Sequence, residues 1–188
     1  MLTVACWSLI QVFGLNRTSA DAHSISFSNY QTGNSPTLTS PSYSNDLRQW
    51  HFWTLTFNPS TSTRVLYRDA VAVASDSPTL AQAFNALATI YIGYNGLTGT
   101  NGIYVNAMFD EFRIYCGTAL TSSQVLAGLY NVFPTGAKFY ASGSAQTGTT
   151  LTDNSGSGNS FTITTLSTAD NVWATKPAVC FCASRTCC

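Results

Sequence analysis

The adjacent acids Asp110 and Glu111 are the residues of this 188-residue chain whose types and spacing could support general acid–base catalysis. Hydrolysis of a glycosidic bond, for example, needs two carboxylates held a fixed distance apart across that bond. Residues 103–115 have the composition of a strand, and successive side chains of a strand point to opposite faces. The two carboxylates are therefore expected to diverge. Glu111 is predicted to form an ion pair with Arg113, and Asp110 to be half-buried and hydrogen-bonded to a turn.

Other groupings of reactive side chains are equally unpromising. The histidines His23 and His51 stand apart, and no serine lies in a G-x-S-x-G sequence with a matching Asp and His. The glycine-rich run GYNGLTG lacks the lysine of a phosphate-binding loop and leads into a strand. Calcium needs several oxygen ligands that converge, so calcium binding stays open without assignable ligands. Four scattered acids are each expected to cap a turn: Asp46, Asp69, Asp76 and Asp153.

Aromatic side chains could instead bind sugars by stacking against them. The chain has four tryptophans, and Trp7, Trp50 and Trp53 are expected to be core residues of a β-sandwich. The candidates for glycan binding are therefore Trp173 and Tyr43, each of which would need an exposed ring with polar neighbours.

The low charge of the chain excludes several classes of partner. Only 9% of the residues are charged and the net charge is zero, against roughly a quarter charged in an average domain. Without a basic stripe to neutralise phosphates, nucleic acid is not an expected partner. The apolar first 15 residues lack the basic region of a signal peptide and are too short for a membrane span, so membrane insertion is not expected either. Such a surface is expected to be both glycosylated, with Asn16 in the acceptor sequence Asn16-Arg17-Thr18, and buried against other subunits.

The cysteines predict an oxidising compartment, which places the protein outside the cell or at the cell surface. Four of the six lie in the final run CFCASRTCC, which resembles the start of a disulfide-rich module. Fifteen full pairings are open to six cysteines, and a metal site in the tail is the less favoured alternative because its spacing is not that of a zinc site. The candidates for disulfide formation are Cys6, Cys116, Cys180, Cys182, Cys187 and Cys188.

Most of the chain consists of short alternating runs separated by Gly, Pro, Ser and Asn, which is typical of strands. In QWHFWTLTF, the side chains of Trp53, Leu55 and Phe57 share one face. One helix is predicted after Thr121, which forms a capping box with Gln124. The pattern predicts an all-β fold, a two-sheet jelly-roll sandwich with one short capped helix and a cysteine-rich C-terminal tail.

Two segments have the order of motifs of a known domain family: QWHFWTLTFNPSTSTRVLYRDAVAVAS, and IYIGYNG followed by MFDEFRIYCGTALTSSQVLAGLY. The first is similar to the tryptophan strand, turn and Y-x-D-G-like hairpin of the laminin G-like, concanavalin A-like family, although Ala70 stands where the family usually has glycine. The second is similar to the closing strands and capped helix of that family, so the resemblance covers residues 2–130. The resemblance implies a two-sheet jelly roll used for glycan binding, adhesion or assembly, and it does not imply catalysis.

The resemblance also divides the chain. Residues 1–133 are expected to form the laminin G-like jelly roll, and 180–188 to begin a disulfide-rich module. LTDNSGSGNSFTI resembles the opening turn of the family domain, displaced beyond the closing helix. Residues 134–179 are therefore expected either to complete the sandwich, in the same or a neighbouring chain, or to begin a second copy. The chain is expected to be part of a longer polypeptide.

These features favour a non-enzymatic structural or adhesive module, a subunit or repeat of a cell-surface filament such as a mastigoneme-like appendage. Its expected partners are further copies or other extracellular proteins. The alternative hypothesis is a lectin-like glycan-binding domain, with glycans as the partners. A hydrolase of the same fold ranks third, because no paired carboxylates are found.

Overall fold

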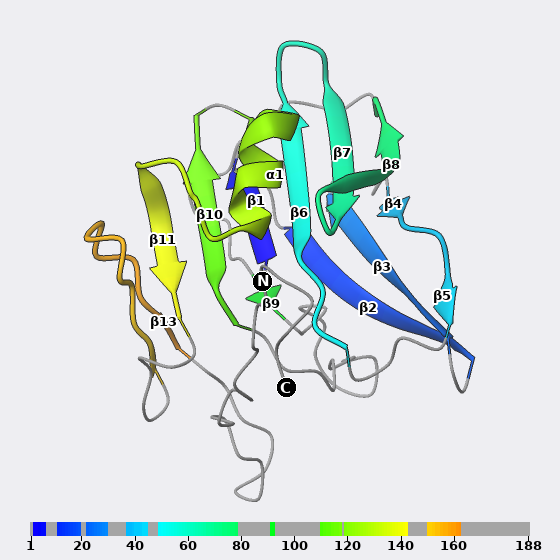
Figure 1. The fold of residues 1–188 in the computed structure, drawn as a ribbon, viewed down its shortest axis with the longest axis horizontal. Helices are drawn as coiled ribbons and strands as arrows, with labels where there is room; N and C mark the ends of the chain where they lie inside the picture. The colour runs from blue at the N-terminus through cyan, green and yellow to red at the C-terminus, as the bar shows by residue number, and fades with distance from the viewer. Residues whose placement is uncertain are drawn as a thin grey trace, which may run out of the picture.

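Two facing β-sheets form the body of the protein and confirm the expected all-β fold (Figure 1). The computed structural model describes residues 2–6, 11–19, 22–29, 37–44, 49–78, 91–92, 110–117, 119–142 and 150–162. The six-stranded sheet has the order β11-β10-β1-β6-β7-β8. Its strands are β1 (Leu2–Cys6), β6 (Trp53–Asn58), β7 (Thr63–Arg68), β8 (Val71–Asp76), β10 (Phe112–Cys116) and β11 (Ala137–Ala141).

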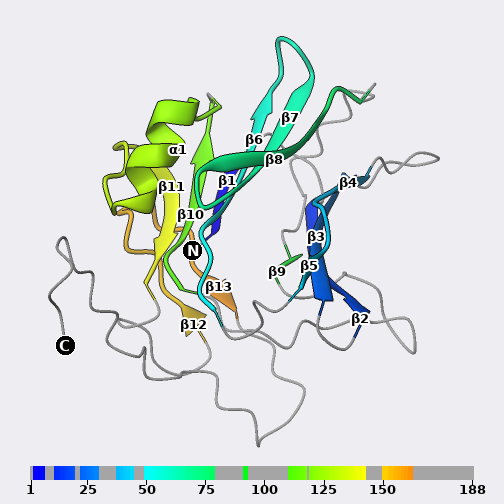
Figure 2. The same ribbon diagram turned by 45° about the vertical axis from the view of Figure 1, so that its right-hand side comes forward.

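The second sheet has the order β4-β3-β2-β9, and β5 pairs with β3 beside β4. Its strands are β2 (Gln11–Ser19), β3 (Ala22–Asn29), β4 (Thr37–Thr39), β5 (Tyr43–Ser44) and β9 (Tyr91–Ile92). A separate short pair is formed by β12 (Thr150–Leu151) and β13 (Phe161–Thr162). Figure 2 shows the five-stranded sheet on one side of the six-stranded sheet and the helix α1 on the other.

Strands β6, β7 and β8 form an antiparallel meander, as their alternating sequence predicts. Asp69 and Ala70 make the tight turn from β7 to β8, with φ angles of 50° and 65°. Positive φ at both central residues gives a turn the twist of the flanking strands. At the centre of the sheet, β1 lies between β6 and β10 and runs parallel to both.

The expected long strand over residues 103–115 is only partly seen. Its last part is β10, while residues 103–109 lie outside the described part of the chain. Asp110 and Glu111 precede β10 rather than belonging to it, and Glu111 has a left-handed φ of 54°. The prediction that Asp110 and Glu111 alternate along a strand is therefore wrong, because both residues precede the strand.

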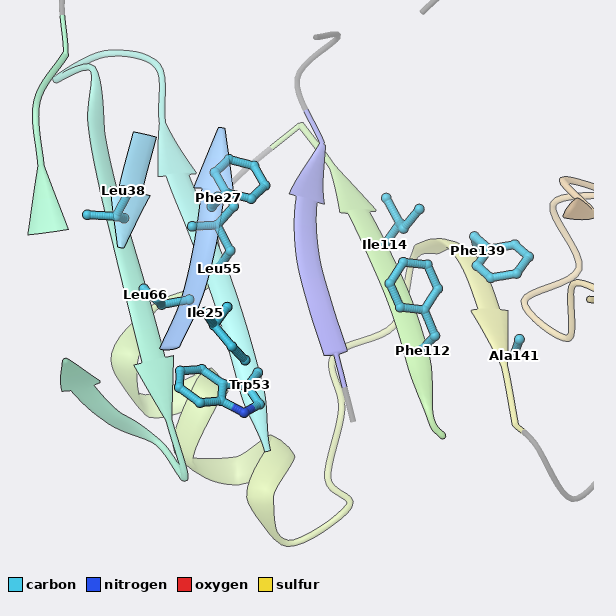
Figure 3. Close-up of a cluster of buried hydrophobic side chains, with 10 residues drawn as sticks. All are labelled: Ile25, Phe27, Leu38, Trp53, Leu55, Leu66, Phe112, Ile114, Phe139 and Ala141. Atoms are coloured by element: carbon cyan, nitrogen blue, oxygen red, sulfur yellow. The ribbon is translucent and has the colours of Figure 1, made fainter. Parts of the chain in front are cut away.

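The main hydrophobic core fills the space between the two sheets (Figure 3). Trp53 and Leu55 of β6 both point into it, as the period of two predicts, and Phe57 is buried as well. Strand β11 contributes Phe139, whose ring lies 5.7 Å from that of Phe112. The buried members of this cluster are Ile25, Phe27, Leu38, Trp53, Leu55, Leu66, Phe112, Ile114, Phe139 and Ala141.

The helix α1 (Ser122–Leu129) covers the outer face of the six-stranded sheet. The capping box is confirmed, because Thr121 accepts from the Gln124 backbone and the Gln124 side chain accepts from the Thr121 N–H at 2.9 Å. Val125 packs with Phe52 and Tyr67 in a second, smaller core. None of the helices in the described residues is long and apolar enough to span a bilayer.

Candidate functional site

Glu111 is held in a cluster around Arg113 rather than facing Asp110. Its Oε2 lies 2.9 Å from an Arg113 nitrogen, which confirms the predicted ion pair, and it accepts a hydrogen bond of 3.0 Å from the Tyr140 hydroxyl. The Arg113 guanidinium is stacked between the rings of Phe133, at 3.6 Å, and Tyr140, at 3.9 Å. Burial, and then the negative charge of Glu111, raise the pKa of Tyr140. This arrangement holds the Glu111 carboxylate between Arg113 of β10 and Tyr140 of β11.

Asp110 is buried, which goes beyond the half-burial expected, and it serves the turn before β10. Its Oδ1 accepts a hydrogen bond of 2.8 Å from the N–H of Glu111, the residue that adopts the left-handed conformation. The predicted turn hydrogen bond is thus confirmed. The two adjacent acids have different neighbours and do not form a pair of catalytic carboxylates.

The described residues do contain an Asp–His pair, but its geometry opposes base catalysis. His51 Nδ1 lies 2.8 Å from Asp69 Oδ2, and His51 Nε2 lies 2.8 Å from an Arg68 nitrogen. The same Arg68 nitrogen also lies 3.3 Å from Nδ1. Both ring nitrogens are therefore engaged by neighbouring side chains of the chain itself. Asp69 also accepts the Phe52 N–H at 2.8 Å, so this cluster fixes the β7–β8 turn against the start of β6.

Tyr43, one of the two glycan-binding candidates, lies against this same cluster. The Arg68 guanidinium is 3.9 Å from the centre of its ring, and the ring of Trp53 meets it edge-on with centroids 5.9 Å apart. Trp53 is buried, as expected. The expectation that Trp50 is a core residue is wrong, because 37% of its surface is exposed. Trp50 is thus more exposed than Tyr43 or Trp53.

Asp76 is not an isolated turn cap, as was expected, but the partner of a buried arginine. Arg64 has no exposed surface, and its Nε donates to Asp76 Oδ1 at 2.8 Å while a second guanidinium nitrogen contacts Oδ2. Its guanidinium also lies 6.0 Å from the centre of the Phe27 ring in the opposite sheet. Sequence reasoning missed this role, although Arg64, Leu66 and Arg68 alternate on the core-facing side of β7.

Asp153 caps a turn, as predicted, and organises the loop that follows β12. Its Oδ1 accepts the N–H groups of Tyr140, at 3.0 Å, and Ser155, at 2.8 Å, and its Oδ2 accepts that of Asn159 at 2.9 Å. Burial alone would raise the pKa of Asp153, but these hydrogen bonds outweigh it and lower the pKa to about 2. Both oxygens are used by the chain itself.

A metal centre is not assembled by this part of the chain. Within the described residues, no group of three or more His, Cys, Asp or Glu side chains is placed to hold an ion. Each described acid instead has a structural partner within the chain: Asp69, Asp76, Asp110, Glu111 and Asp153.

Several predicted site residues are described only in part or not at all. Cys6 and Cys116 are direct Cα partners on β1 and β10, and Cys116 is exposed. Asn16 lies on β2 opposite Ser24 of β3. The other candidates lie outside the described residues: Trp7, Asp46, Trp173, Cys180, Cys182, Cys187 and Cys188.

Comparison with known proteins places this geometry in a family. The family model of the concanavalin A-like lectin/glucanases superfamily, laminin G type, matches residues 11–126, more than half of the chain. The chain belongs to this superfamily. Its laminin G-like domains are generally non-catalytic binding modules, and they commonly bind carbohydrates or proteins. The match ends before β11, so Phe139 and the Asp153 loop lie beyond it.

Among solved structures, the chain is similar to the crystal structure of an S-layer domain-containing protein from Clostridium thermocellum. The two share 19% identity over 66% of this chain and 67% of that one, with a TM-score of 0.39. The curated proteins contain no significant match.

Proposed function

We propose that this laminin G-like chain is a non-catalytic, extracellular structural or adhesive module, a subunit or repeat of a cell-surface filament such as a mastigoneme-like appendage. The observation that carries the non-catalytic part is the engagement of all five described carboxylates in separate structural contacts. Acid–base hydrolysis of a glycosidic bond needs two carboxylates that face a common space. Here Glu111 is neutralised by Arg113, and Asp69 is held by His51 on a different part of the sheet.

The structural part of the proposal is supported by the sheet beyond the closing helix. β11 pairs with β10 through Phe112–Ala141, Arg113–Tyr140 and Ile114–Phe139, and its Phe139 is only 1% exposed. We infer that residues 134–179 complete the sandwich of residues 1–133, and that 180–188 begin a disulfide-rich module. A chain whose folding unit continues past the family domain in this way suits an array of linked repeats.

The positions of two sites on the backbone support modifications that are typical of extracellular proteins, a disulfide and a glycan. Cys6 and Cys116 are direct partners on neighbouring strands, a separation within the range that a disulfide can bridge. Asn16 pairs with Ser24 of β3 and begins the acceptor sequence Asn16-Arg17-Thr18. We therefore propose a Cys6–Cys116 disulfide and a glycan on Asn16. Alkylation of the native chain before and after reduction, followed by peptide mapping, tests both.

Electron microscopy of the native material tests the assembly role. Continuous fibres decorated by an antibody to this chain are the expected result, and discrete particles would contradict it. A separate assay incubates the purified chain with a panel of polysaccharides, where release of reducing sugar would overturn the non-catalytic assignment.

The exposed indole of Trp50 favours glycan binding as the second candidate function. Its neighbour Gln49 is exposed, and an aromatic face beside polar groups is a common sugar platform. On a glycan array, this alternative predicts binding that Trp50→Ala removes. Tyr43→Ala should leave the binding largely intact, because the Tyr43 ring already packs against Arg68 and Trp53. Absence of any glycan signal would leave the structural role as the better account.

A further inference from the structure

We propose that residues 37–44 carry O-linked sugars on their exposed hydroxyls, which are those of Thr37, Thr39, Ser42 and Ser44. The inference goes beyond the N-linked glycan on Asn16, and it rests on the extracellular location in the proposed function. It starts from one edge of the five-stranded sheet, where β4 and β5 both pair with β3 (Figure 2).

The hydroxyls of this edge are turned away from the core. Leu38 of β4 is buried in the main core, and Tyr43 of β5 packs partly against it. Their sequence neighbours Thr37, Thr39 and Ser44 are exposed. Successive side chains of a strand point to opposite faces, so these hydroxyls lie on the outer face of the sheet, where an enzyme can reach them.

The link between β4 and β5 supports the same reading. Pro41 and Ser42 lie in this link, and both are exposed. Proline fixes its own φ and keeps the residue before it extended, which suits a segment that must enter the active site of a modifying enzyme. Segments rich in Ser, Thr and Pro are typical sites of O-glycosylation. Composition and conformation therefore agree over residues 37–44.

The chemistry of this surface favours a sugar over a protein partner. Residues 37–44 contain no charged residue, and none of the exposed large apolar side chains of the described chain lies among them. Protein interfaces are usually centred on aromatic residues, methionine or arginine. Hydroxyls are instead the acceptors of glycosyl transfer. Attached sugars would also cover an edge strand, a role that lysine or a covering element has in other proteins.

The modification needs a transferase and an activated sugar whose anomeric carbon is linked to a nucleotide or lipid phosphate. The hydroxyl oxygen of the acceptor residue attacks the anomeric carbon and forms the new C–O bond. The bond from that carbon to the phosphate oxygen breaks, and the nucleotide or lipid phosphate leaves with the electron pair. The hydroxyl proton passes to a base of the transferase.

Ser40 is an internal control within the same segment. It is only 5% exposed, and its Oγ accepts the Ile25 N–H at 3.0 Å and donates to the Pro41 carbonyl at 2.9 Å. A transferase that acts on the folded chain cannot reach this hydroxyl. Sugar on its neighbours but not on Ser40 is therefore expected.

The β6–β7 hairpin is a second control, which separates backbone conformation from composition. Ser60 and Thr61 are exposed beside Pro59, as the hydroxyls of residues 37–44 are beside Pro41. Here, however, the chain turns sharply, because Ser62 has a φ of 53° and the Ser60 N–H donates to the Asn58 side chain at 3.0 Å. These two hydroxyls are expected to remain unmodified.

Glycopeptide mapping of the chain purified from its native source tests the inference, with a fragmentation method that keeps sugars on their side chains. The expected result is a mass gain of one or more sugar residues on at least one exposed hydroxyl of residues 37–44. The variant Thr37→Ala/Thr39→Ala/Ser42→Ala/Ser44→Ala, expressed in the same cells, should lose all of this mass. The matched control Ser60→Ala/Thr61→Ala removes two exposed hydroxyls elsewhere and should keep it.

Unmodified peptides over residues 37–44 in the native material overturn the proposal. Sugar on Ser40, or equal occupancy at Ser60 or Thr61, overturns it as well, because the extended edge would then not direct the transfer. The Asn16 peptide separates this failure from that of the proposed function. If Asn16 carries a glycan and residues 37–44 carry none, only this inference fails, whereas sugar at neither site contradicts the extracellular assignment too.

Discussion

The two edges of the six-stranded sheet differ in both closure and depth. β11 is sealed by the Asp153 loop and inserts Phe139 and Ala141 into the main core. Within the described residues, β8 has no strand partner on its outer side and lies near β4 of the second sheet, and only its residues Val73 and Ala74 pack partly against that core. Both are terminal strands of one sheet, yet a loop hydrogen-bonds to the backbone of β11 and no described strand does so on the outer side of β8.

This difference does not follow the limits of the family match. β8 lies inside the matched residues 11–126, whereas β11 lies beyond them. The six-stranded sheet and its core therefore extend past the residues that the family model matches. Their stability depends on buried apolar surface, and Phe139 supplies more of it than any residue of β8.

Phe139→Ala is the strongest test of that claim. Truncating a buried phenylalanine removes its transfer energy and leaves a cavity, so the free energy of unfolding should fall by about 3–5 kcal/mol. Urea unfolding followed by tryptophan fluorescence measures this loss. Tyr130→Ala, at an aromatic that is 72% exposed, should change stability by less than about 0.5 kcal/mol.

The contrast between β11 and β8 also predicts that a substitution in β8 causes only a small loss of stability. Val73→Ala removes two methyl groups that are only half-buried, so the expected loss is about 1 kcal/mol. Equal losses at Phe139 and Val73 would show that the two edges contribute alike, and the contrast drawn between them would be wrong.

Asp76→Ala tests the ion pair at the end of β8. It leaves the charge of the fully buried Arg64 without this partner, which in a sealed interior costs several kcal/mol. Because 32% of the Asp76 side chain is exposed, solvent reduces the expected loss to about 2 kcal/mol. The double variant Arg64→Met/Asp76→Ala should recover most of it, since no unpaired charge then remains. A double variant that is less stable than Asp76→Ala would mean that Arg64 acts through other contacts.

The stability that the Asp153 loop contributes at the edge of β11 should depend on pH. The pKa of Asp153 is lowered from 3.8 to about 2, so its carboxylate contributes stability above pH 4 that is lost as the pH falls toward 2. Asp153→Asn keeps the size of the side chain but removes this titration. The stability difference between the two proteins should therefore be largest near neutral pH and shrink steadily between pH 4 and 2.

Ser157→Ala is the control for that experiment. It removes one neutral hydrogen bond of the same loop, from Ser157 Oγ to the Ala137 carbonyl, so any loss should be about 1 kcal/mol or less and independent of pH. A pH-independent difference for Asp153→Asn as well would contradict the charged role of Asp153.

Local patterns predicted a large part of this fold. The capping box at Thr121 identified the helix, and alternation identified β6 and the core positions Trp53 and Leu55. Both signals are short-range, because they depend on hydrogen bonds and side-chain periods within a few residues. The Glu111–Arg113 pair was found for the same reason.

The errors arose where distant contacts decide the outcome. Asp110 and Glu111 read as strand residues, but Glu111 takes a left-handed φ that few non-glycine residues adopt. Trp50 precedes β6 and is exposed, whereas Phe52, which also precedes β6, is buried against Tyr67 and Val125. The partners of Asp76 and His51 come from neighbouring strands, so no spacing along the sequence could reveal them.

The smallest predicted effect lies in the turn that leads into β8. Ala70 has a φ of 65°, a conformation that costs an L-residue with a Cβ atom about 1 kcal/mol and glycine almost nothing. Ala70→Gly relieves this strain but adds freedom to the unfolded chain, so a net stabilisation of about 0.5 kcal/mol or less is expected. The same substitution at Ala72, within the strand, should instead destabilise by about 0.5–1 kcal/mol. If both substitutions destabilise the protein equally, Ala70 is not strained, and the turn into β8 stores no conformational strain in its backbone.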